Sequence, residues 1–236
     1  MLPARLVAFT DTIRGLDPDA PTIPYRIERW NDHLGDNKYL SRLSRRFQHR
    51  VSRGDLGLLS REAHADPEGL PALFLATMIW GFGDTNYGPW RTRRMLDDLA
   101  RQKATGTDAL GLTLHRLRDG DLMAAYRGFD VEWCGPPFVA KFFYAVGLGM
   151  DVYPMPLILD SVVATSLWVL ALDRALDIRQ YVKGVDASGK GSVTRYPEGY
   201  VRYVRLLHEW GQALGCRADA VEMFLFDPPA AFSTGR

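Results

Sequence analysis

Apolar residues recur at three- and four-residue intervals along most of the chain, whereas the strict alternation of a half-buried strand is scarce. This pattern predicts an all-α fold. The helices that we expect are 36–53, 70–80, 91–102, two short helices between 109 and 127 on either side of Asp119-Gly120, 135–149, and a C-terminal helix near 220–227. The first should begin at Asp36 or Asn37, because both side chains cap helices well.

Three segments are apolar enough to be buried on every side, namely 70–80, 135–149 and 154–173. The most apolar, 154–173, is interrupted by Asp160 and falls short of the roughly 20 apolar residues that a membrane span requires. We interpret it as a buried core helix and expect no membrane association.

Basic residues cluster in two of the predicted helices. One group lies in 36–53, where Arg45 and Arg46 are candidates for contacts with phosphates, although such a run is most often only a solvated face. The other group follows the loop GFGDTNYGPW and comprises Arg91, Arg93 and Arg94. Three cations in the first turn would oppose the helix dipole unless an anion lies nearby, so they hint at contacts with phosphates.

The chain of 236 residues is 47% hydrophobic and is long enough for one compact unit or two joined lobes. Its net charge of +1 shows no global excess of cations, so any nucleic-acid binding must come from local patches. Cys134 and Cys216 have no partners at metal-ligand spacing, which argues against a zinc site or a disulfide framework. Because the N-terminus carries no apolar run of signal-peptide length, we expect a cytoplasmic protein, nucleoid-associated in a bacterium.

The segment 183–199 is rich in Gly, Ser and charge, and we expect it to be flexible. Gly184, Gly189 and Lys190 come close to a phosphate-binding P-loop. Gly191 stands where that motif requires Ser or Thr, and Pro197 soon interrupts the chain, so nucleotide hydrolysis is not expected.

Lys141 is the one charged residue in the apolar segment 135–149. Burying an ammonium group is unfavourable, so lysine seldom occupies such a position. An amine that acts as a nucleophile must be neutral, and an apolar site favours the neutral form. Two other interpretations stay open: Lys141 extends from a helix start to the surface, or it pairs with a carboxylate for structural reasons.

Asp160 lies between an apolar run and the next predicted helix. Its carboxylate could stabilise positive charge that develops on a substrate. It could equally be the N-cap of a helix that begins at Ser161, and the two roles are compatible.

These residues resemble the 8-oxoguanine DNA glycosylases of the helix-hairpin-helix superfamily. In that family a hairpin precedes a nucleophilic lysine at the start of a helix, and the catalytic aspartate follows nineteen residues later. Asp160 stands nineteen residues after Lys141. The resemblance implies that these two residues are the catalytic pair.

Two further regions, in the same order along the chain, extend the resemblance. The loop around GDTNYGPW is similar to the one that inserts an asparagine into the DNA stack, which places Asn86 at the wedge position. The helix AVEMFLFD is similar to the one that lines the base pocket, with Glu222 and Phe226 in the places of a glutamine and a phenylalanine. An ionised carboxylate only accepts hydrogen bonds, so Glu222 leaves the excised base open. Alternatively, Phe226 simply packs.

The sequence also departs from the family. Residues 137–140 (Pro-Phe-Val-Ala) stand where the hairpin usually reads Gly-hydrophobic-Gly, which puts in doubt the hairpin's contacts with phosphate and any bound alkali ion. The resemblance implies a two-lobed helical fold with the active site in a cleft between the lobes and no N-terminal β-domain. We expect one catalytic unit over 1–236, with about 70–140 as the middle lobe and about 36–69 plus 141–236 as the second.

The implied function is a bifunctional glycosylase and abasic-site lyase. It would act as a monomer, without cofactor or metal, on double-stranded DNA that carries a damaged or modified base such as 8-oxoguanine. Two alternatives remain from the sequence: a DNA-binding relative that has lost the chemistry, and a helical scaffold for a protein partner in which Lys141 and Asp160 form an internal salt bridge.

Overall fold

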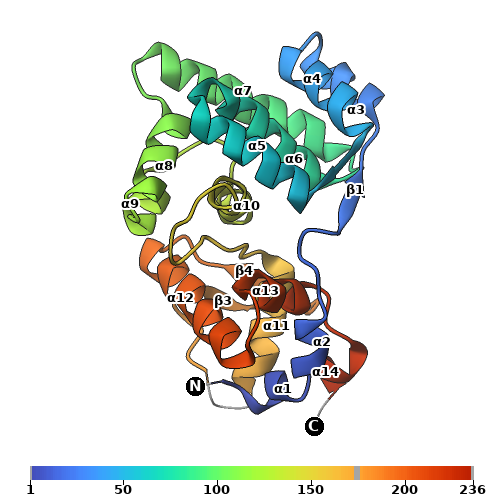
Figure 1. Cartoon of the computed structure of the whole chain (residues 1–236), viewed down its shortest axis with the longest axis vertical. Coiled ribbons are helices and arrows are strands. Elements are labelled where there is room, and N and C mark those ends of the chain that lie inside the picture. The colour runs from blue at the N-terminus through green and yellow to red at the C-terminus, as the bar shows by residue number, and fades with distance from the viewer. Residues whose placement is uncertain (1, 173–175, 235–236) are drawn as a thin grey trace. The chain divides into compact units, whose positions relative to one another are not determined.

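A computed structural model of the chain, which describes residues 2–172 and 176–234, is mostly helical (Figure 1). The predicted all-α class is confirmed. Within the described residues, the short strands form only two antiparallel two-stranded ladders, β1–β2 and β3–β4. None of the described helices is both long and apolar enough to cross a membrane.

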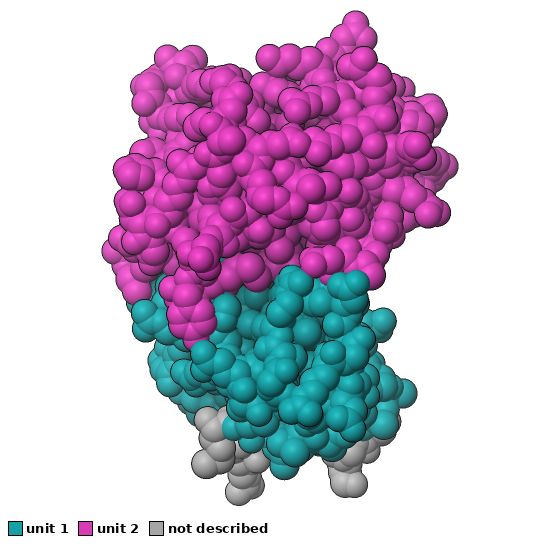
Figure 2. All heavy atoms as spheres, in the orientation of Figure 1, with its two compact units in different colours: residues 1–18, 156–236 teal, residues 19–155 magenta. Residues whose placement is uncertain are grey.

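The chain divides into two compact units (Figure 2). Unit 1 comprises residues 1–18 and 156–236, and unit 2 comprises residues 19–155. These boundaries differ from the lobes that we expected, which changed over near residues 70 and 140.

Unit 2 carries most of the helices. Its elements are β1 (Thr22–Pro24), α3 (Ile27–Leu34), α4 (Lys38–Phe47), β2 (Arg50–Ser52), α5 (Arg53–Ala65), the 3-10 turn η1 (Pro67–Gly69), α6 (Leu70–Phe82), α7 (Tyr87–Ala104), α8 (Ala109–Arg118), α9 (Leu122–Gly128) and α10 (Pro136–Gly147). Helices α6 and α10 form its core: each is apolar on all sides, and α10 packs against both α6 and α5.

The predicted helix 36–53 is in fact interrupted. Asn37 caps α4 by accepting hydrogen bonds from two backbone amides, as predicted, but the helix ends at Phe47. Gln48 and His49 adopt left-handed backbone conformations that reverse the chain. Residues 50–52 then pair with β1, and Ser52 begins α5 through a capping box with Asp55.

Unit 1 contains α1 (Ala4–Val7), α2 (Thr10–Arg14), α11 (Ser161–Leu172), β3 (Val182–Val185), β4 (Gly191–Val193), α12 (Pro197–Leu214), α13 (Ala218–Phe226) and α14 (Ala230–Thr234). Helix α13 packs against both α11 and α12. The expected core helix 154–173 is shorter than predicted: residues 156–159 are buried but extended, the helix begins at Ser161, and Asp173 lies outside the described residues.

The segment expected to be flexible forms an ordered hairpin. Strands β3 and β4 pair across a turn in which the Asp186 carboxylate accepts hydrogen bonds from Ser188 and from the backbone amide of Lys190. The near P-loop is therefore a polar β-turn between strands, without the helix that follows a true P-loop.

Candidate functional site

Lys141 lies in the middle of α10 and is buried, with 7% of its surface exposed. The chain has four other lysines, and all of them are exposed: Lys38, Lys103, Lys183 and Lys190. Lys141 is therefore distinguished from every other lysine by its environment. Its burial argues against the alternative in which the side chain reaches the surface from a helix start.

The start of α10 differs from the resemblance. The helix begins at Pro136, so Lys141 lies in its second turn, and residues 137–140 are helical where the family has its hairpin. The physical reason is local: proline is well tolerated in the first turn of a helix, and both Pro136 and Pro137 stand there.

The Lys141 side chain lies against α6 at a position that carries no side chain. A Cβ at Gly81 would lie 3.0 Å from Lys141 Cδ and 3.2 Å from Phe138 Cε1. The Lys141 Nζ atom lies 5.7 Å from the centroid of the Phe138 ring, within range of a cation–π contact. Gly81 and Phe138 together shape the space that the lysine occupies.

The C-terminal end of α10 is fastened to α5. Ser60 Oγ donates to the Val146 carbonyl (2.7 Å) and accepts from the Gly149 amide (3.1 Å). His64 Nε2 lies 3.1 Å from the same carbonyl, and Arg118 Nε donates to His64 Nδ1. Burial lowers the pKa of His64, and the positive charge of Arg118 adds to this effect, whereas the Val146 carbonyl opposes it. Because Nδ1 accepts the hydrogen bond from Arg118, the imidazole links Arg118 of α8 to the Val146 carbonyl of α10.

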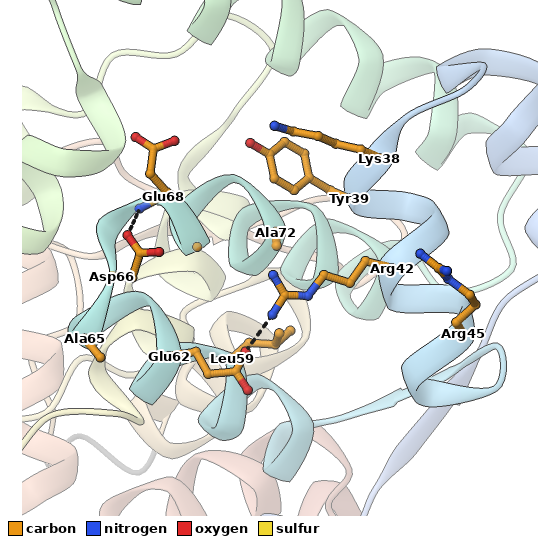
Figure 3. A pocket seen from close by; sticks show the side chains of 11 residues that line it. Lys38, Tyr39, Arg42, Arg45, Leu59, Glu62, Ala65, Asp66, Glu68 and Ala72 are labelled. Atoms are coloured by element: carbon orange, nitrogen blue, oxygen red, sulfur yellow. Dashed lines mark hydrogen bonds and ion pairs between the residues drawn. The ribbon is translucent and has the colours of Figure 1, made fainter.

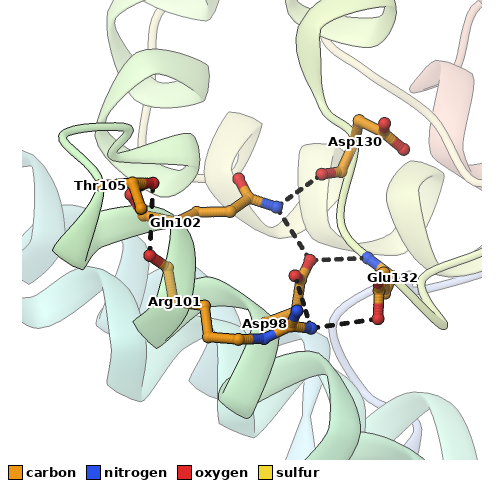
Figure 4. Close-up of polar contacts among 6 residues, drawn as sticks. All are labelled: Asp98, Arg101, Gln102, Thr105, Asp130 and Glu132. Atoms are coloured by element: carbon orange, nitrogen blue, oxygen red, sulfur yellow. Dashed lines mark hydrogen bonds and ion pairs between the residues drawn. The ribbon is translucent and has the colours of Figure 1, made fainter.

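The loop that leads into α10 is held by a buried carboxylate on α7 (Figure 4). Asp98, 5% exposed, accepts hydrogen bonds from the Glu132 backbone amide and from Gln102 Nε2, both at 2.8 Å. Gln102 also donates to the Asp130 carbonyl, and Arg101 bridges Asp98 and Glu132. Loop and helix α7 form one hydrogen-bonded assembly.

Asp160 caps α11, as the sequence predicts. Its Oδ1 accepts hydrogen bonds from the amides of Val162 (3.0 Å) and Val163 (3.1 Å). The extended segment before it is fixed by two tyrosines of α12: Tyr200 donates to the Leu157 carbonyl (2.8 Å) and Tyr203 to the Ile158 carbonyl (2.5 Å). These bonds set the position of the carboxylate within unit 1.

Glu222 and Phe226 lie one turn apart on α13. Glu222 is fully buried, whereas Phe226, the last residue of the helix, is 45% exposed. Both residues belong to unit 1, as Asp160 does. Helix α13 packs against α11, and Ser166 Oγ of α11 donates a hydrogen bond to the Leu225 carbonyl of α13. The structure thus brings together the helices of three predicted site residues.

Asn86 is exposed in the short connection between α6 and α7, and its side chain makes no cap bond to α7. Helix α7 begins at Tyr87, not near Arg91 as expected, because residues 87–90 join it. Arg91, Arg93 and Arg94 therefore lie in the second turn, away from the unpaired amides, so the argument from the helix dipole loses its force.

The arginines proposed for DNA-backbone contacts have different surroundings. Arg46 pairs with Glu62 at 2.7 Å, and Arg93 pairs with Asp97 at 2.7 Å. Arg45 is exposed and donates to the Ser41 carbonyl; Arg91 donates to the Trp133 carbonyl, and Arg94 lies over the Trp90 ring.

Arg45 also lines a pocket between α4, α5 and α6 (Figure 3), together with Lys38, Arg42, Glu62, Asp66 and Glu68. The cations stand on α4, whereas the carboxylates stand on α5 and at the turn η1 that follows it. Because these carboxylates would repel an anion in the pocket, the pocket is a poor match for a polyanion.

The predicted site residues fall into two groups. Lys141, Asn86 and the five arginines belong to unit 2, and Asp160, Glu222 and Phe226 belong to unit 1. Within the described residues, no three side chains of His, Cys, Asp or Glu gather as a metal site would require.

Several residues that support the site have little or no signal in the sequence. Gly81, Asp98, Ser60 and Tyr203 act through contacts with residues far along the chain, and a single sequence does not reveal such pairs. Asp98 offered only a weak hint, since it is an acidic residue on the face of α7 that also carries buried Met95.

A family model described as "Putative 8-oxoguanine DNA glycosylase OGG-like protein" matches residues 16–226, which is most of the chain and includes every predicted site residue. No curated protein and no solved structure matches.

Proposed function

The chain belongs to this OGG-like family, and from this premise we propose that it is a DNA glycosylase with abasic-site lyase activity, in which Lys141 is the nucleophile. The observation that carries the proposal is the burial of Lys141 at the centre of an apolar helix, whereas every other lysine of the chain is exposed. Imine formation requires a neutral amine, and burial in an apolar site favours that form.

In the proposed reaction, an extruded damaged nucleotide presents its anomeric carbon to Lys141. The neutral Nζ bonds to C1′ as the bond to the base breaks, and the base leaves with the electron pair and takes up a proton. Opening of the sugar ring gives an imine. Removal of a C2′ proton then expels the 3′ phosphate, which cuts the strand by β-elimination.

Asp160 would stabilise the positive charge that develops on the sugar and would accept the proton released by the lysine. Its use as a helix cap supports this role, because two backbone amides donate hydrogen bonds to Oδ1 and hold the carboxylate in one orientation. Tyr200 and Tyr203 would act as positioning residues through the backbone of 157–158.

Recognition would be divided between the two units. Asn86, exposed before α7, would fill the space left by the extruded nucleotide, and Phe226 would contact the flipped base. Glu222, as a carboxylate, would favour a base edge that presents donors, such as the N1–H and amino group of a guanine-type base. Arg45 and Arg94, which are exposed, are better candidates for phosphate contacts than Arg46 and Arg93, which are paired with carboxylates.

The test is borohydride trapping on duplex oligonucleotides that carry 8-oxoguanine or an abasic site. Borohydride reduces the imine to a stable amine and so links protein to DNA. We expect a crosslink with the wild-type protein and with Lys103→Gln, an exposed lysine of the same unit, and none with Lys141→Gln. Salt-dependent DNA binding without a crosslink would favour the non-catalytic DNA-binding alternative, and a crosslink that persists in Lys141→Gln would exclude Lys141 as the nucleophile.

A further inference from the structure

Three aromatic rings form a continuous row between the start of α7 and the loop before α10. The ring centroids of Tyr87 and Trp90 lie 5.3 Å apart, and those of Trp90 and Trp133 lie 5.2 Å apart. The two outer rings are exposed, Tyr87 by 50% and Trp133 by 47%. Two exposed aromatic side chains joined by a third form an apolar surface patch, and such patches often mark binding sites.

Trp133 is held in an unusual backbone conformation. Its φ angle is +66°, in the left-handed region that residues with a large side chain rarely adopt. A turn closed by the Cys134 amide and the Val131 carbonyl fixes this conformation, and Arg91 Nε donates to the Trp133 carbonyl at 2.7 Å. Strain of this kind persists where the surroundings impose it, often at binding sites.

The row is rigid on both sides. Tyr87 and Trp90 belong to the first turn of α7. Trp133 directly follows Glu132, which Asp98 and Arg101 of the same helix bind (Figure 4). A ring surface that is ordered before a ligand arrives loses little conformational entropy on binding.

The charge around the rings is positive. Arg94 lies over Trp90, with its guanidinium carbon 5.6 Å from the ring centroid, and Arg91 lies 5.8 Å from the centroid of Tyr87. Arg94 has no salt bridge with a carboxylate among the described residues. Aromatic faces backed by arginine match a strand of nucleic acid, whose bases stack while its phosphates pair with cations.

The row is connected to Lys141 through further rings of unit 2. Tyr87 contacts Phe82, Phe82 stacks on Phe138 with centroids 4.1 Å apart, and Phe138 contacts the lysine amine. A base on the outer rings would therefore lie on the same side of unit 2 as the residues that lead to the proposed nucleophile.

We propose that Tyr87, Trp90 and Trp133 form a stacking platform for an unpaired nucleobase, and that the protein binds single-stranded DNA through it. The inference rests on the proposed function for DNA as the partner. It adds the class of DNA that should bind most tightly: a lesion-bearing strand with unpaired bases next to the lesion, as in a bubble or single-stranded region, whereas the fully paired duplex should bind more weakly. Stacked bases in an intact duplex would not offer their faces to these rings.

The experiment is a fluorescence-anisotropy titration at one fixed salt concentration, with a labelled single-stranded oligothymidine and with the matching duplex. Trp133→Ala and Tyr87→Ala should each bind the single strand roughly tenfold more weakly. Trp133→Phe, which keeps an aromatic face, should retain most of the affinity. Tyr196→Ala, which removes an aromatic residue of unit 1 that is 65% exposed, is the control and should bind as the wild type does.

Circular dichroism melting shows whether each variant is folded, and Trp133→Phe keeps the test valid if the alanine variant is not. Full affinity in folded Trp133→Ala, or an equal loss in Tyr196→Ala, would overturn the platform. A second copy of the chain on the rings would appear as a dimer in sedimentation with unchanged DNA binding, which would also overturn it.

The Lys141→Gln variant separates this inference from the proposed function. It should bind the single strand like the wild type, because the platform does not include Lys141. A wild-type protein that gives no crosslink but binds the single strand through the rings would therefore count against the chemistry only, whereas normal wild-type crosslinking together with ring-independent binding would count against the platform only.

Discussion

Gly81 lies directly against the Lys141 side chain: a Cβ at residue 81 would come within 3.0 Å of Lys141 Cδ and 3.6 Å of its Cε. An absent side chain on α6 thus leaves the space in which the lysine of α10 lies. The position of the amine depends on a residue sixty places earlier in the chain.

Gly81→Ala should displace Lys141 without unfolding the protein. Alanine favours a helix by up to about 1 kcal/mol over glycine, which offsets part of the crowding. We expect the rate of borohydride trapping to fall about tenfold or more, because a small displacement of a nucleophile greatly lowers the rate of its reaction. Gly57→Ala is the matched control, since its Cβ would meet neighbours at an ordinary 3.7 Å. Equal trapping rates in the two variants would refute the positioning role of Gly81.

Substitutions at Asp160 separate its cap from its charge. Asp160→Asn keeps an oxygen that can accept the amides of Val162 and Val163, so thermal stability should hardly change. Asp160→Ala removes the cap and should destabilise the protein by about 1 kcal/mol. Both variants should lose at least about a hundredfold in the rate of base release. A fully active Asp160→Asn protein would reduce Asp160 to a structural cap.

Stability should depend on pH through His64. Because burial lowers the pKa of this imidazole in the folded protein, the unfolded chain takes up a proton first as the pH falls below about 6.5. The free energy of unfolding should therefore decrease from pH 7.5 to pH 5, beginning near the ordinary histidine pKa. Urea titrations across this range test the effect, and His64→Gln should give a flatter dependence. The same slope in both proteins would mean that other groups dominate.

The carboxylate of Asp98 should matter far more than that of its neighbour Asp97. Asp98→Ala leaves the part-buried Glu132 amide without its acceptor and removes one of the two acceptors of Gln102 Nε2, which should destabilise the protein by about 1–3 kcal/mol. Hydrogen exchange in residues 130–135 should also accelerate. Asp97→Ala breaks only an exposed pair with Arg93 and should change stability by less than about 1 kcal/mol. If the two variants melt alike, the loop is held by something other than Asp98.

Much of the fold follows from local patterns in the sequence. The apolar runs predict α6 and α10 because buried helices need no polar face, and the cap residues Asn37 and Asp160 mark the starts of α4 and α11. The resemblance predicts Lys141 as the nucleophile from its spacing to Asp160. Each of these signals is contained in a few neighbouring residues.

What could not be predicted depends on contacts between distant residues. The left-handed pair Gln48 and His49 ends α4 because residues 50–52 pair with a strand nearly thirty positions earlier, and no glycine or proline marks the turn. The hairpin formed by β3 and β4 was hidden by polar composition, since its packing is against α11. Trp133 carries no signal in the sequence, because its exposure and its contact with Trp90 arise only from the fold.

The most direct test of the central claim is to identify the amino acid that carries the DNA. After borohydride trapping on an abasic-site duplex, the crosslinked protein is digested with protease and nuclease and mapped by tandem mass spectrometry. We predict that the sugar adduct is found on Lys141 alone. An adduct on Lys38, Lys103, Lys183, Lys190 or the N-terminal amine, with Lys141 unmodified, would contradict the account.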